Sequence, residues 1–209
     1  MVSSKIIDTF ESKISGTITV SENAGQKKVV AGGLIQSGGS INSLWYKPLS
    51  SLKSQTFPQI LILGLGAGTI ARLTRNLWSN AQITGVEIDK QMIVIGENHF
   101  QLRSIPNLIV IHADVFPWVS KSLNCYDLVL IDVFCGNQVV EKLYSETFIT
   151  DLKKILNQSG IVIVNQLFYN HYKEKAKKLV NSFEKHFNKI RLVRNFTNVF
   201  VICQNPITS

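Results

Sequence analysis

Three glycines and a carboxylate form the pattern in this sequence that most directly predicts ligand binding. Residues 60–69 read ILILGLGAGT, an aliphatic run followed by Gly64, Gly66 and Gly68. A buried parallel strand that runs through such a turn into a helix brings backbone amides close to a ligand, where side chains would block it. Glu87, in GVEID, lies 23 residues after Gly64. An acid at this spacing commonly binds ribose hydroxyls, so the pattern predicts a nucleoside site.

Two more carboxylates follow predicted strands farther along the chain. Asp114 follows the third strand in IHADVF, and Asp132 follows the fourth in YDLVLIDVF. Parallel strands end at the same edge of a sheet, so we expect both acids beside the glycine turn and Glu87. Asp114 is also predicted to cap the helix that follows it. Asp127, at the start of the fourth strand, is predicted to lie at the opposite edge and to have a structural role.

An alternation of aliphatic and amphipathic segments predicts the elements that position these residues. After Pro58 come the aliphatic runs QILIL, AQITGVEI, NLIVIHA, YDLVLID and GIVIVNQ, with helices predicted at 69–77, 90–98 and 145–156. Near-continuous aliphatic strands separated by amphipathic helices predict a doubly wound α/β core with a mostly parallel sheet. The final runs KIRLVRN and TNVFVICQ predict an antiparallel pair, which gives the sheet seven strands.

The first part of the chain has a different pattern. The stretch GTITVSENAGQKKVVAGGLIQSGG alternates with a period of two and is interrupted by Asn and Gly, which predicts a small β-hairpin unit. We therefore expect residues 1–55 to form a small N-terminal β-strand unit and residues 56–209 to form a Rossmann-like nucleoside-binding domain. The exposed edges of the β-unit favour a homodimer.

The composition predicts an ordinary globular protein. The 209 residues are 45% hydrophobic and 17% charged, enough apolar material for a full core. No run resembles a signal peptide or approaches the ~18 apolar residues of a membrane span, so we expect a cytoplasmic protein with no membrane partner. Three cysteines, an odd number, favour reduced thiols. Scattered histidines and the lack of paired Cys or His spacing predict no metal site.

The net charge of +8 is concentrated near the end of the chain. Residues 171–195 hold eight basic and two acidic side chains, and Tyr172, Ala176, Leu179 and Phe183 repeat there at helical spacing. The lysines therefore occupy the opposite face of a predicted helix. This pattern is typical of a solvated helix face, and it does not favour nucleic acid as a partner.

Taken in order, the segments resemble the spermidine synthase family, which has the fold of the class I S-adenosylmethionine-dependent methyltransferases. The resemblance is carried by ILILGLGAGT, ITGVEIDK, NLIVIHADVFPWV, YDLVLIDVF and LYSETFITDLKKILNQSGIVIVNQ. The stretch GTITVSENAGQKKVVAGGLIQS resembles that family's small N-terminal β-domain, including its Gln before the core, here Gln36. The likeness covers roughly residues 15–168. The order and spacing of the motifs are more specific than any one of them.

The resemblance implies how a nucleoside donor would be bound. The donor would be S-adenosylmethionine or its decarboxylated form, used as a co-substrate without a metal, and the three glycines would pass beneath its nucleoside. Gln36 would belong to the same binding site, Glu87 would hold the ribose hydroxyls, and Asp114 would meet the adenine amino group.

The resemblance also implies a reaction centre at Asp132. This residue matches the first acid of the family's D-S-S/T-D-P loop, which accepts the proton of the attacking amine. A carboxylate there can attract a protonated amine and take its proton as nitrogen attacks the carbon next to the sulfonium. Tyr46, in the segment that corresponds to the family's Y-H-E, would contact the small-molecule acceptor.

Three acids of the family pattern are missing from this sequence. The family's G-G-G-D-G-G has Ala67 in place of its acid, which would remove selection for the donor's amino group. The second acid of the D-S-S/T-D-P loop is Cys135, and the acid of Y-H-E is Pro48, next to Lys47. A pocket without these carboxylates would bind the dication putrescine poorly.

Three functions remain open on the sequence alone. The first, which we favour, is a spermidine-synthase-like transferase that moves a methyl or aminopropyl group to an acceptor other than putrescine. The second is a genuine polyamine aminopropyltransferase in which Glu141 substitutes for a missing acid. The third is a non-catalytic nucleoside-binding or scaffold protein that has kept the fold.

Overall fold

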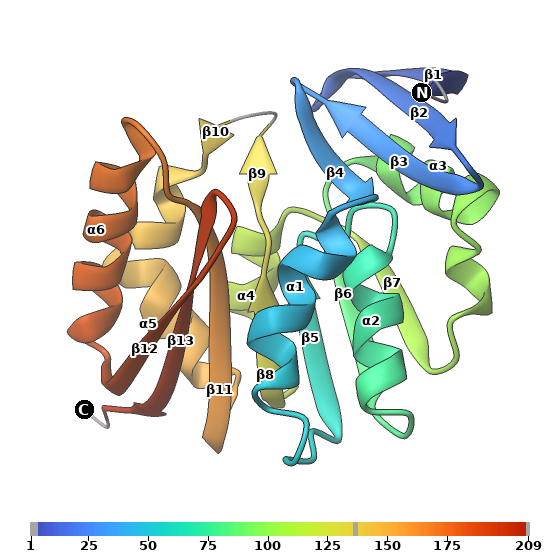
Figure 1. Ribbon diagram of the computed structural model, residues 1–209. Helices are drawn as coiled ribbons and strands as arrows, with labels where there is room; N and C mark the ends of the chain where they lie inside the picture. The colour runs from blue at the N-terminus through green and yellow to red at the C-terminus, as the bar shows by residue number, and fades with distance from the viewer. Residues whose placement is uncertain (1–3, 136–137, 208–209) are drawn as a thin grey trace.

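The computed structural model describes residues 4–135 and 138–207, and a seven-stranded sheet forms its centre (Figure 1). The strands of this sheet are β5 Gln59–Leu63, β6 Gln82–Glu87, β7 Leu108–His112, β8 Tyr126–Ile131, β11 Leu156–Leu167, β12 Phe187–Asn195 and β13 Asn198–Pro206. Their order is β12-β13-β11-β8-β5-β6-β7. β13 runs antiparallel to both of its neighbours, and the strands from β11 to β7 are parallel. The predicted doubly wound, mostly parallel sheet is confirmed.

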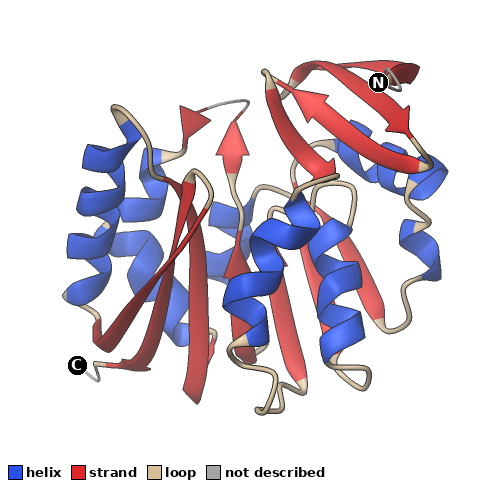
Figure 2. Cartoon of the chain, viewed as in Figure 1, coloured by secondary structure: helices blue, strands red, loops and turns tan. Residues whose placement is uncertain are grey.

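Helices cover both faces of the large sheet (Figure 2). They are α1 Ile41–Ser50, α2 Thr69–Leu77, α3 Lys90–His99, α4 Val115–Lys121, α5 Glu146–Lys154 and α6 Tyr172–Glu184, with short 3-10 helices η1 Leu102–Ser104 and η2 Glu141–Tyr144. Side chains of β5 alternate between the faces, as a buried strand requires. Ile60 and Ile62 pack in one cluster with α1 and α2, whereas Leu61 and Leu63 pack in another with α4, α5 and α6.

A small antiparallel sheet precedes the core and lies over α3. Its strands, in the order β1-β2-β3-β4, are β1 Lys5–Ser12, β2 Gly16–Asn23, β3 Gln26–Ala31 and β4 Leu34–Gly38. Buried Ile18, Val20 and Val29 of this sheet share a cluster with Met92 and Ile95 of α3. The small sheet is thereby held against the core by apolar packing as well as by the chain connection.

Helix α1 connects the two sheets and was not expected from the sequence, which predicted only strands in this part of the chain. Its last turn contains Pro48, a residue that breaks helices when it lies in their interior. Leu44, Trp45 and Leu49 recur at helical spacing and pack against the large sheet. Burial of this apolar face therefore stabilises a helix that local propensity alone would not predict.

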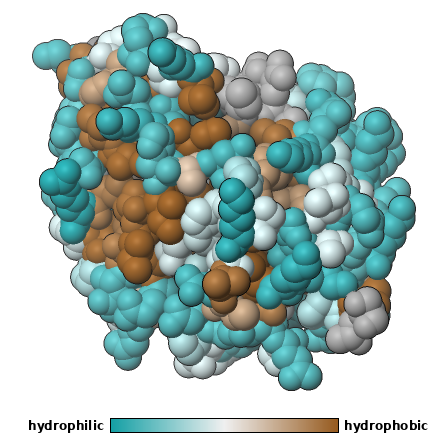
Figure 3. All heavy atoms as spheres, turned by 180° about the vertical axis from the view of Figure 1, so that it is seen from behind, coloured by the Kyte–Doolittle hydropathy of each residue, from teal (hydrophilic) through white to brown (hydrophobic). Residues whose placement is uncertain are grey.

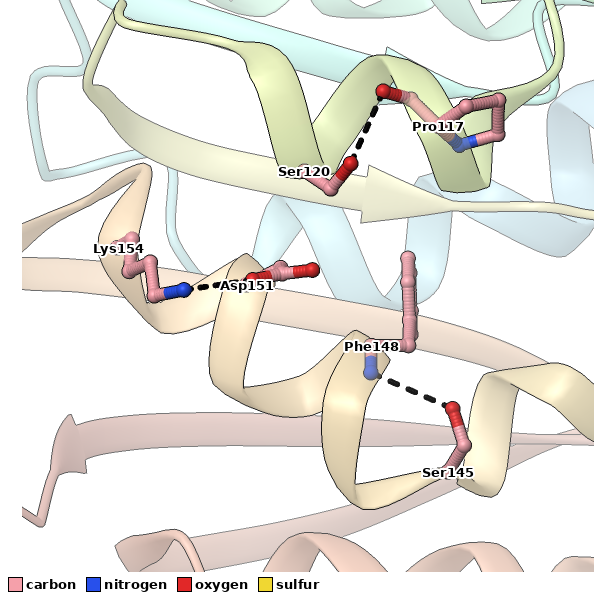
Figure 4. A network of polar contacts seen from close by, with 6 residues as sticks. All are labelled: Pro117, Ser120, Ser145, Phe148, Asp151 and Lys154. Carbon is pink, nitrogen blue, oxygen red and sulfur yellow. Dashed lines mark hydrogen bonds and ion pairs between the residues drawn. The ribbon is translucent and has the colours of Figure 1, made fainter.

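Helices α4 and α5 pack against each other on the second face (Figure 4). The hydroxyl of Ser145 accepts a hydrogen bond of 3.3 Å from the Phe148 amide and so caps α5. Within α4, the Ser120 hydroxyl donates to the carbonyl of Pro117. The rings of Phe116 and Phe148 meet edge to face with their centroids 5.1 Å apart. The start of α4, at the cavity edge of the sheet, is thereby fixed.

Residues 172–184 of the basic segment form α6 and pack as predicted, whereas the end of the segment, from Phe187, belongs to strand β12. The apolar residues on one face of α6 are buried: Tyr172, Ala176, Leu179 and Phe183. On the other face, Lys175 pairs with Glu141 and Lys177 pairs with Glu174. The lysines of α6 therefore belong to the solvated side of a packed helix.

Strand β7 is one outer edge of the large sheet and exposes apolar side chains. Ile109 and Val110 of β7 are both exposed. Seen from behind, apolar residues gather on part of this side of the molecule (Figure 3). This apolar surface is distinct from the carboxyl edge of the sheet, where the polar groups lie.

The ends of β5 and β8 approach each other closely at Gly64. The Asp132 amide donates a hydrogen bond of 2.8 Å to the Leu63 carbonyl, and the Gly64 amide donates one of 2.9 Å to the Val86 carbonyl. Gly64 has φ +86°, a conformation that L side chains rarely adopt. A Cβ at this position would overlap the backbone carbonyl of Asp132. The turn therefore needs glycine for both its conformation and its space.

We predict that Gly64→Ala destabilises the fold far more than an alanine at a turn glycine with open space. Gly25 has φ +77°, and a Cβ added there would have nothing within 4 Å, so Gly25→Ala should cost only the conformational penalty of about 1–2 kcal/mol. Gly64→Ala should cost about 3 kcal/mol or more, because backbone must move as well. Urea unfolding of both variants measures the difference, and equal losses would contradict the close approach.

Candidate functional site

A cavity of about 370 Å³ lies at the carboxyl edge of the parallel strands. The strand ends that form it are level, since Leu63 is paired with both Val86 and Ile131. The predicted site residues that line the cavity are Gln36, Gly64, Gly66, Glu87, Asp114 and Asp132. The parallel register therefore brings together Gly64, Glu87 and Asp132, which span 68 positions of the chain, and β4 of the small sheet adds Gln36.

Glu87 is held in place by the backbone around it. One carboxylate oxygen accepts a hydrogen bond of 2.7 Å from the Gly66 amide, and the other accepts one of 2.9 Å from the Asp89 amide. The residue is only 8% exposed. Burial raises the pKa of Glu87 above its ordinary value, and the hydrogen bonds from Asp89 and Gly66 oppose that rise. The two oxygens together offer about four acceptor sites, more than the backbone donors use, so a ligand hydroxyl could also bind there.

Asp132 also borders the cavity, and two side chains orient its carboxylate. The Trp45 indole donates to Oδ2 at 3.2 Å, and the Asn165 amide donates to Oδ1 at 2.7 Å. Asn198 in turn donates to the Asn165 carbonyl oxygen at 2.9 Å. Burial raises the pKa of Asp132 to about 6, and the hydrogen bonds from Asn165 and Trp45 oppose the rise. Such a carboxylate is ionised at neutral pH yet accepts a proton more readily than an exposed one.

Asp114 has the structural role that the sequence predicted and also lines the cavity. It is the N-cap of α4, and its side chain accepts a hydrogen bond of 3.0 Å from the Phe116 amide. Asp127, at the other end of β8, accepts hydrogen bonds from the Gln59 amide and the Asn157 side chain. Asp127 therefore joins strands at the edge opposite the cavity.

The turn between β1 and β2 forms part of the cavity wall, which no sequence motif predicted. The hydroxyls of Ser12 and Ser15 each donate to the same oxygen of Asp89 at 2.6 Å. Asp89 is buried and also caps α3 through the Gln91 amide. Lys13, carried by this turn, lines the cavity. The sequence contains no sign of this contact beyond the presence of Asp89 in GVEID. The contact joins residues that are more than 70 positions apart in the chain.

The end of β4 contacts the glycine turn directly. The Ala67 amide donates a hydrogen bond of 2.9 Å to the Ser37 hydroxyl. A Cβ at Gly66 would crowd that hydroxyl and the Gln36 carbonyl. Gln36 itself lines the 370 Å³ cavity and a second one beside it. The small sheet is therefore part of the site and not only an appendage.

Three of the predicted site residues do not line the 370 Å³ cavity. Tyr46 is 52% exposed on the outer side of α1, and the side chain of Glu141 is 73% exposed and pairs with Lys175. Gly68 is the N-cap of α2, packed against Leu102. The spacing of the apolar residues in α1 would have indicated that Trp45, not Tyr46, points inward. Cys135, the substituted loop acid, has a side chain outside the described part of the chain.

The expectation that residue 67 faces the donor is wrong. Ala67 is 0% exposed and packs in the apolar cluster between the small sheet and α3. It is absent from the cavity lining. Gly96 of α3 packs so closely that a Cβ there would touch the Ala67 backbone. The alanine is therefore a packing residue in this protein, and donor selection must rest on other groups.

Among the described side chains, which do not include that of Cys135, no three His, Cys, Asp or Glu residues come together as metal ligands do. Over the ranges 4–135 and 138–207, no helix has the length and apolar character needed to cross a bilayer.

Most of the chain is similar to known proteins. A family model described as the spermine/spermidine synthase domain matches residues 48–205. A curated relative, the polyamine aminopropyltransferase of Chromobacterium violaceum, is 31% identical over 127 residues, which are 60% of this chain and 49% of the relative. The chain thus spans about half or less of the length of this relative and of those from Bifidobacterium longum and Vibrio vulnificus.

Solved structures share the fold across nearly the whole chain. A probable spermidine synthase from Corynebacterium glutamicum gives a TM-score of 0.79 at 16% identity, covering 96% of this chain and 80% of its own. A spermidine synthase in complex with the transition state analogue AdoDATO gives 0.80 at 16% identity, covering 96% and 74%. The chain therefore has a class I methyltransferase-like fold preceded by a four-stranded antiparallel sheet.

We predict that Ala67→Asp destabilises the protein and does not create a new contact in the cavity. The carboxylate would enter an apolar cluster without a partner, which costs about 3–5 kcal/mol. Ala24→Asp is the matched control, because Ala24 is exposed in a turn at φ +48°, where Asp is well tolerated. Thermal unfolding of both variants measures the contrast. An Ala67→Asp protein as stable as wild type would place residue 67 at the cavity after all.

Proposed function

Because the chain belongs to the spermine/spermidine synthase family, we propose that it transfers the aminopropyl group of decarboxylated S-adenosylmethionine to a small amine. The observation that carries the proposal is that Glu87 and Asp132 border one cavity, on either side of the glycine turn. The names of the curated relatives, polyamine aminopropyltransferases, support the reaction type. The AdoDATO complex of a spermidine synthase with the same fold supports a substrate site in this fold.

The donor would be bound by groups that the fold has already oriented. Glu87 would accept hydrogen bonds from the ribose hydroxyls, since its carboxylate is fixed by two backbone amides. Asp114 and Gln36 border the same cavity and would meet other polar groups of the nucleoside. Val115 and Phe116, which follow Asp114, supply apolar wall for the base. S-adenosylmethionine, the precursor that keeps its carboxylate, is the alternative donor.

Asp132 would act as the proton acceptor of the transfer. The amine nitrogen attacks the methylene carbon bonded to sulfur, a C–N bond forms, and the C–S bond breaks with its electron pair moving to sulfur. The products are an aminopropylated amine and a neutral thioether nucleoside, and the surplus proton of the nitrogen passes to Asp132. The hydrogen bonds from Trp45 and Asn165 keep the carboxylate pointed in one direction. The protein thus contributes alignment and a base, because the sulfonium is already a good leaving group.

The acceptor in this proposal is a small amine other than putrescine. Glu141, the acid that could have substituted for the missing second carboxylate, lies in the solvent and pairs with Lys175 of α6. Pro48 of α1, which replaces another acid of the family pattern, is buried in helix packing. The second ammonium of a diamine would therefore lack the partner that makes its burial favourable.

Replacement of Glu87 by Gln should reduce donor affinity at least about tenfold. The variant removes the negative charge that strengthens the two proposed hydrogen bonds from the ribose hydroxyls. Each of these is worth about 1.5–3 kcal/mol when the acceptor is ionised. Glu97→Gln is the control, because Glu97 lies on α3 and pairs with Arg103 at the surface. Calorimetric titration with both donors and with methylthioadenosine measures the affinity. Curves for Glu87→Gln that match those of Glu97→Gln would move the nucleoside to another site.

Replacement of Asp132 by Asn should lower turnover about 10²-fold or more while donor binding changes little. Because the raised pKa of Asp132 is about 6, the plot of wild-type turnover against pH should show an inflection near pH 6. Wild-type turnover should fall as the pH drops through that value, since the protonated carboxyl cannot accept a proton. The Asp132→Asn variant should lack this inflection. Asp127→Asn, at the other end of β8, should change stability at most.

Mass spectrometry of the products, with each donor and a panel of amines, provides the turnover measurement. Normal turnover by Asp132→Asn would remove this mechanism and leave the fold assignment intact. Donor binding without product from any acceptor would instead support the non-catalytic, nucleoside-binding alternative.

A further inference from the structure

A second chamber of about 280 Å³ lies behind Asp132, between α1 and the strands β11 and β13. Four residues line both this chamber and the larger cavity: Gln36, Ile41, Asp132 and Phe134. A molecule in the chamber would therefore contact one side of Asp132 while a donor contacts the other. In the proposed function, this is the place for the acceptor amine.

The polar wall of the chamber is neutral except at Asp132. Its neutral hydrogen-bonding side chains are Gln36, Ser40, Asn165, Thr197 and Asn198. Three of them form a chain that ends at Asp132. The Thr197 hydroxyl donates to Oδ1 of Asn198, the Asn198 amide nitrogen donates to Oδ1 of Asn165, and the Asn165 amide nitrogen donates to Oδ1 of Asp132. Among the described residues that line the chamber, Asp132 is the only charged one.

No nearby acid in the sequence could complete a site for a second ammonium. The segment 135–139 reads CGNQV and contains no Asp or Glu. The next acid along the chain is Glu141, which is mostly exposed and pairs with Lys175. The remainder of the chamber wall is apolar, and includes Leu34, Leu44 and Leu167.

We propose that the acceptor is a primary monoamine whose far end is uncharged and carries a hydroxyl or amide. This inference rests on the proposed function. The amine would lie at Asp132, which supplies one negative charge for one cation. The far end would exchange hydrogen bonds with neutral groups such as Ser40 and Asn198, which satisfy a hydroxyl well. A second ammonium at that end would be desolvated without a carboxylate partner, so a diamine would bind poorly.

The selectivity between an amino alcohol and a diamine would follow from the second ammonium of the diamine, which has no carboxylate partner in the chamber. A site built with neutral hydrogen-bonding groups accepts an alcohol and penalises the cation of equal length. The pair 4-aminobutan-1-ol and 1,4-diaminobutane isolates this effect, because the two molecules differ only in the far group. The bonds formed and broken are the same for both, since only the near nitrogen reacts.

The experiment titrates both amines into the protein saturated with methylthioadenosine and then measures transfer from decarboxylated S-adenosylmethionine. The wild type should favour 4-aminobutan-1-ol over 1,4-diaminobutane at least about tenfold, in binding and in kcat/KM, because only the diamine buries an unpaired charge. Equal binding, preference for the diamine, or binding of neither amine would overturn the inference.

A charge added to the chamber should reverse part of this selectivity. Ser40 is the N-cap of α1 and makes no side-chain capping bond, so Ser40→Asp adds a carboxylate at a position where Asp is favoured. Diamine binding should improve about threefold to tenfold relative to the amino alcohol. Ser43→Asp adds the same charge to the same helix outside the chamber and should leave the ratio unchanged. Equal effects of the two variants would also overturn the inference.

Turnover separates this inference from the proposed function. Amino alcohol binding with the expected selectivity, but no transferred aminopropyl group in the products, would overturn the transferase proposal and leave the ligand class standing. Transfer to the diamine in preference to the amino alcohol would support the transferase proposal and overturn the inference about the acceptor.

Discussion

A half-buried carboxylate, Asp132, is held where two parallel strands meet, and most of the site is arranged around it. The backbone of Asp132 can lie against β5 only because Gly64 has no Cβ. Its side chain then receives hydrogen bonds from Trp45 of α1 and Asn165 of β11. These contacts join helix α1, the sheet centre and the cavity through one group. Taking a carboxylate out of water is unfavourable, and the two donors compensate for part of that loss.

The small N-terminal sheet forms the wall of the site that faces the ends of the large sheet's strands. Ser37 accepts a hydrogen bond from the glycine turn, and Ser12 and Ser15 donate to Asp89 at the start of α3. Because these contacts are directed to backbone and buried acids next to Glu87, they fix the distance between the two walls of the cavity. Apolar packing alone would hold the sheet in place but would not fix its register against the turn.

The charges divide the site into two unlike halves. The larger cavity is bordered by Lys13 and by four carboxylates, Glu87, Asp89, Asp114 and Asp132, of which the first three bind backbone amides of the fold. The smaller chamber shares Asp132 but otherwise offers neutral amides and hydroxyls. A carboxylate committed to backbone amides orients a hydroxyl well, whereas a lone carboxylate in a neutral chamber selects a single cation. The electrostatics of the halves therefore suit different ligands.

The sequence by itself determined the sheet and the strand-end groups of the site. Aliphatic runs at regular intervals fix parallel strands, and parallel strands end at one edge, so the strand pattern alone places Glu87, Asp114 and Asp132 together. Tertiary packing decided which neighbours those groups have. Burial turned Trp45 inward and Tyr46 outward, enclosed Ala67 in an apolar cluster, and brought the β1–β2 turn to Asp89. These contacts depend on how the small sheet and α1 pack against the core, and the periodicity of a single segment carries no information about the surface it will meet.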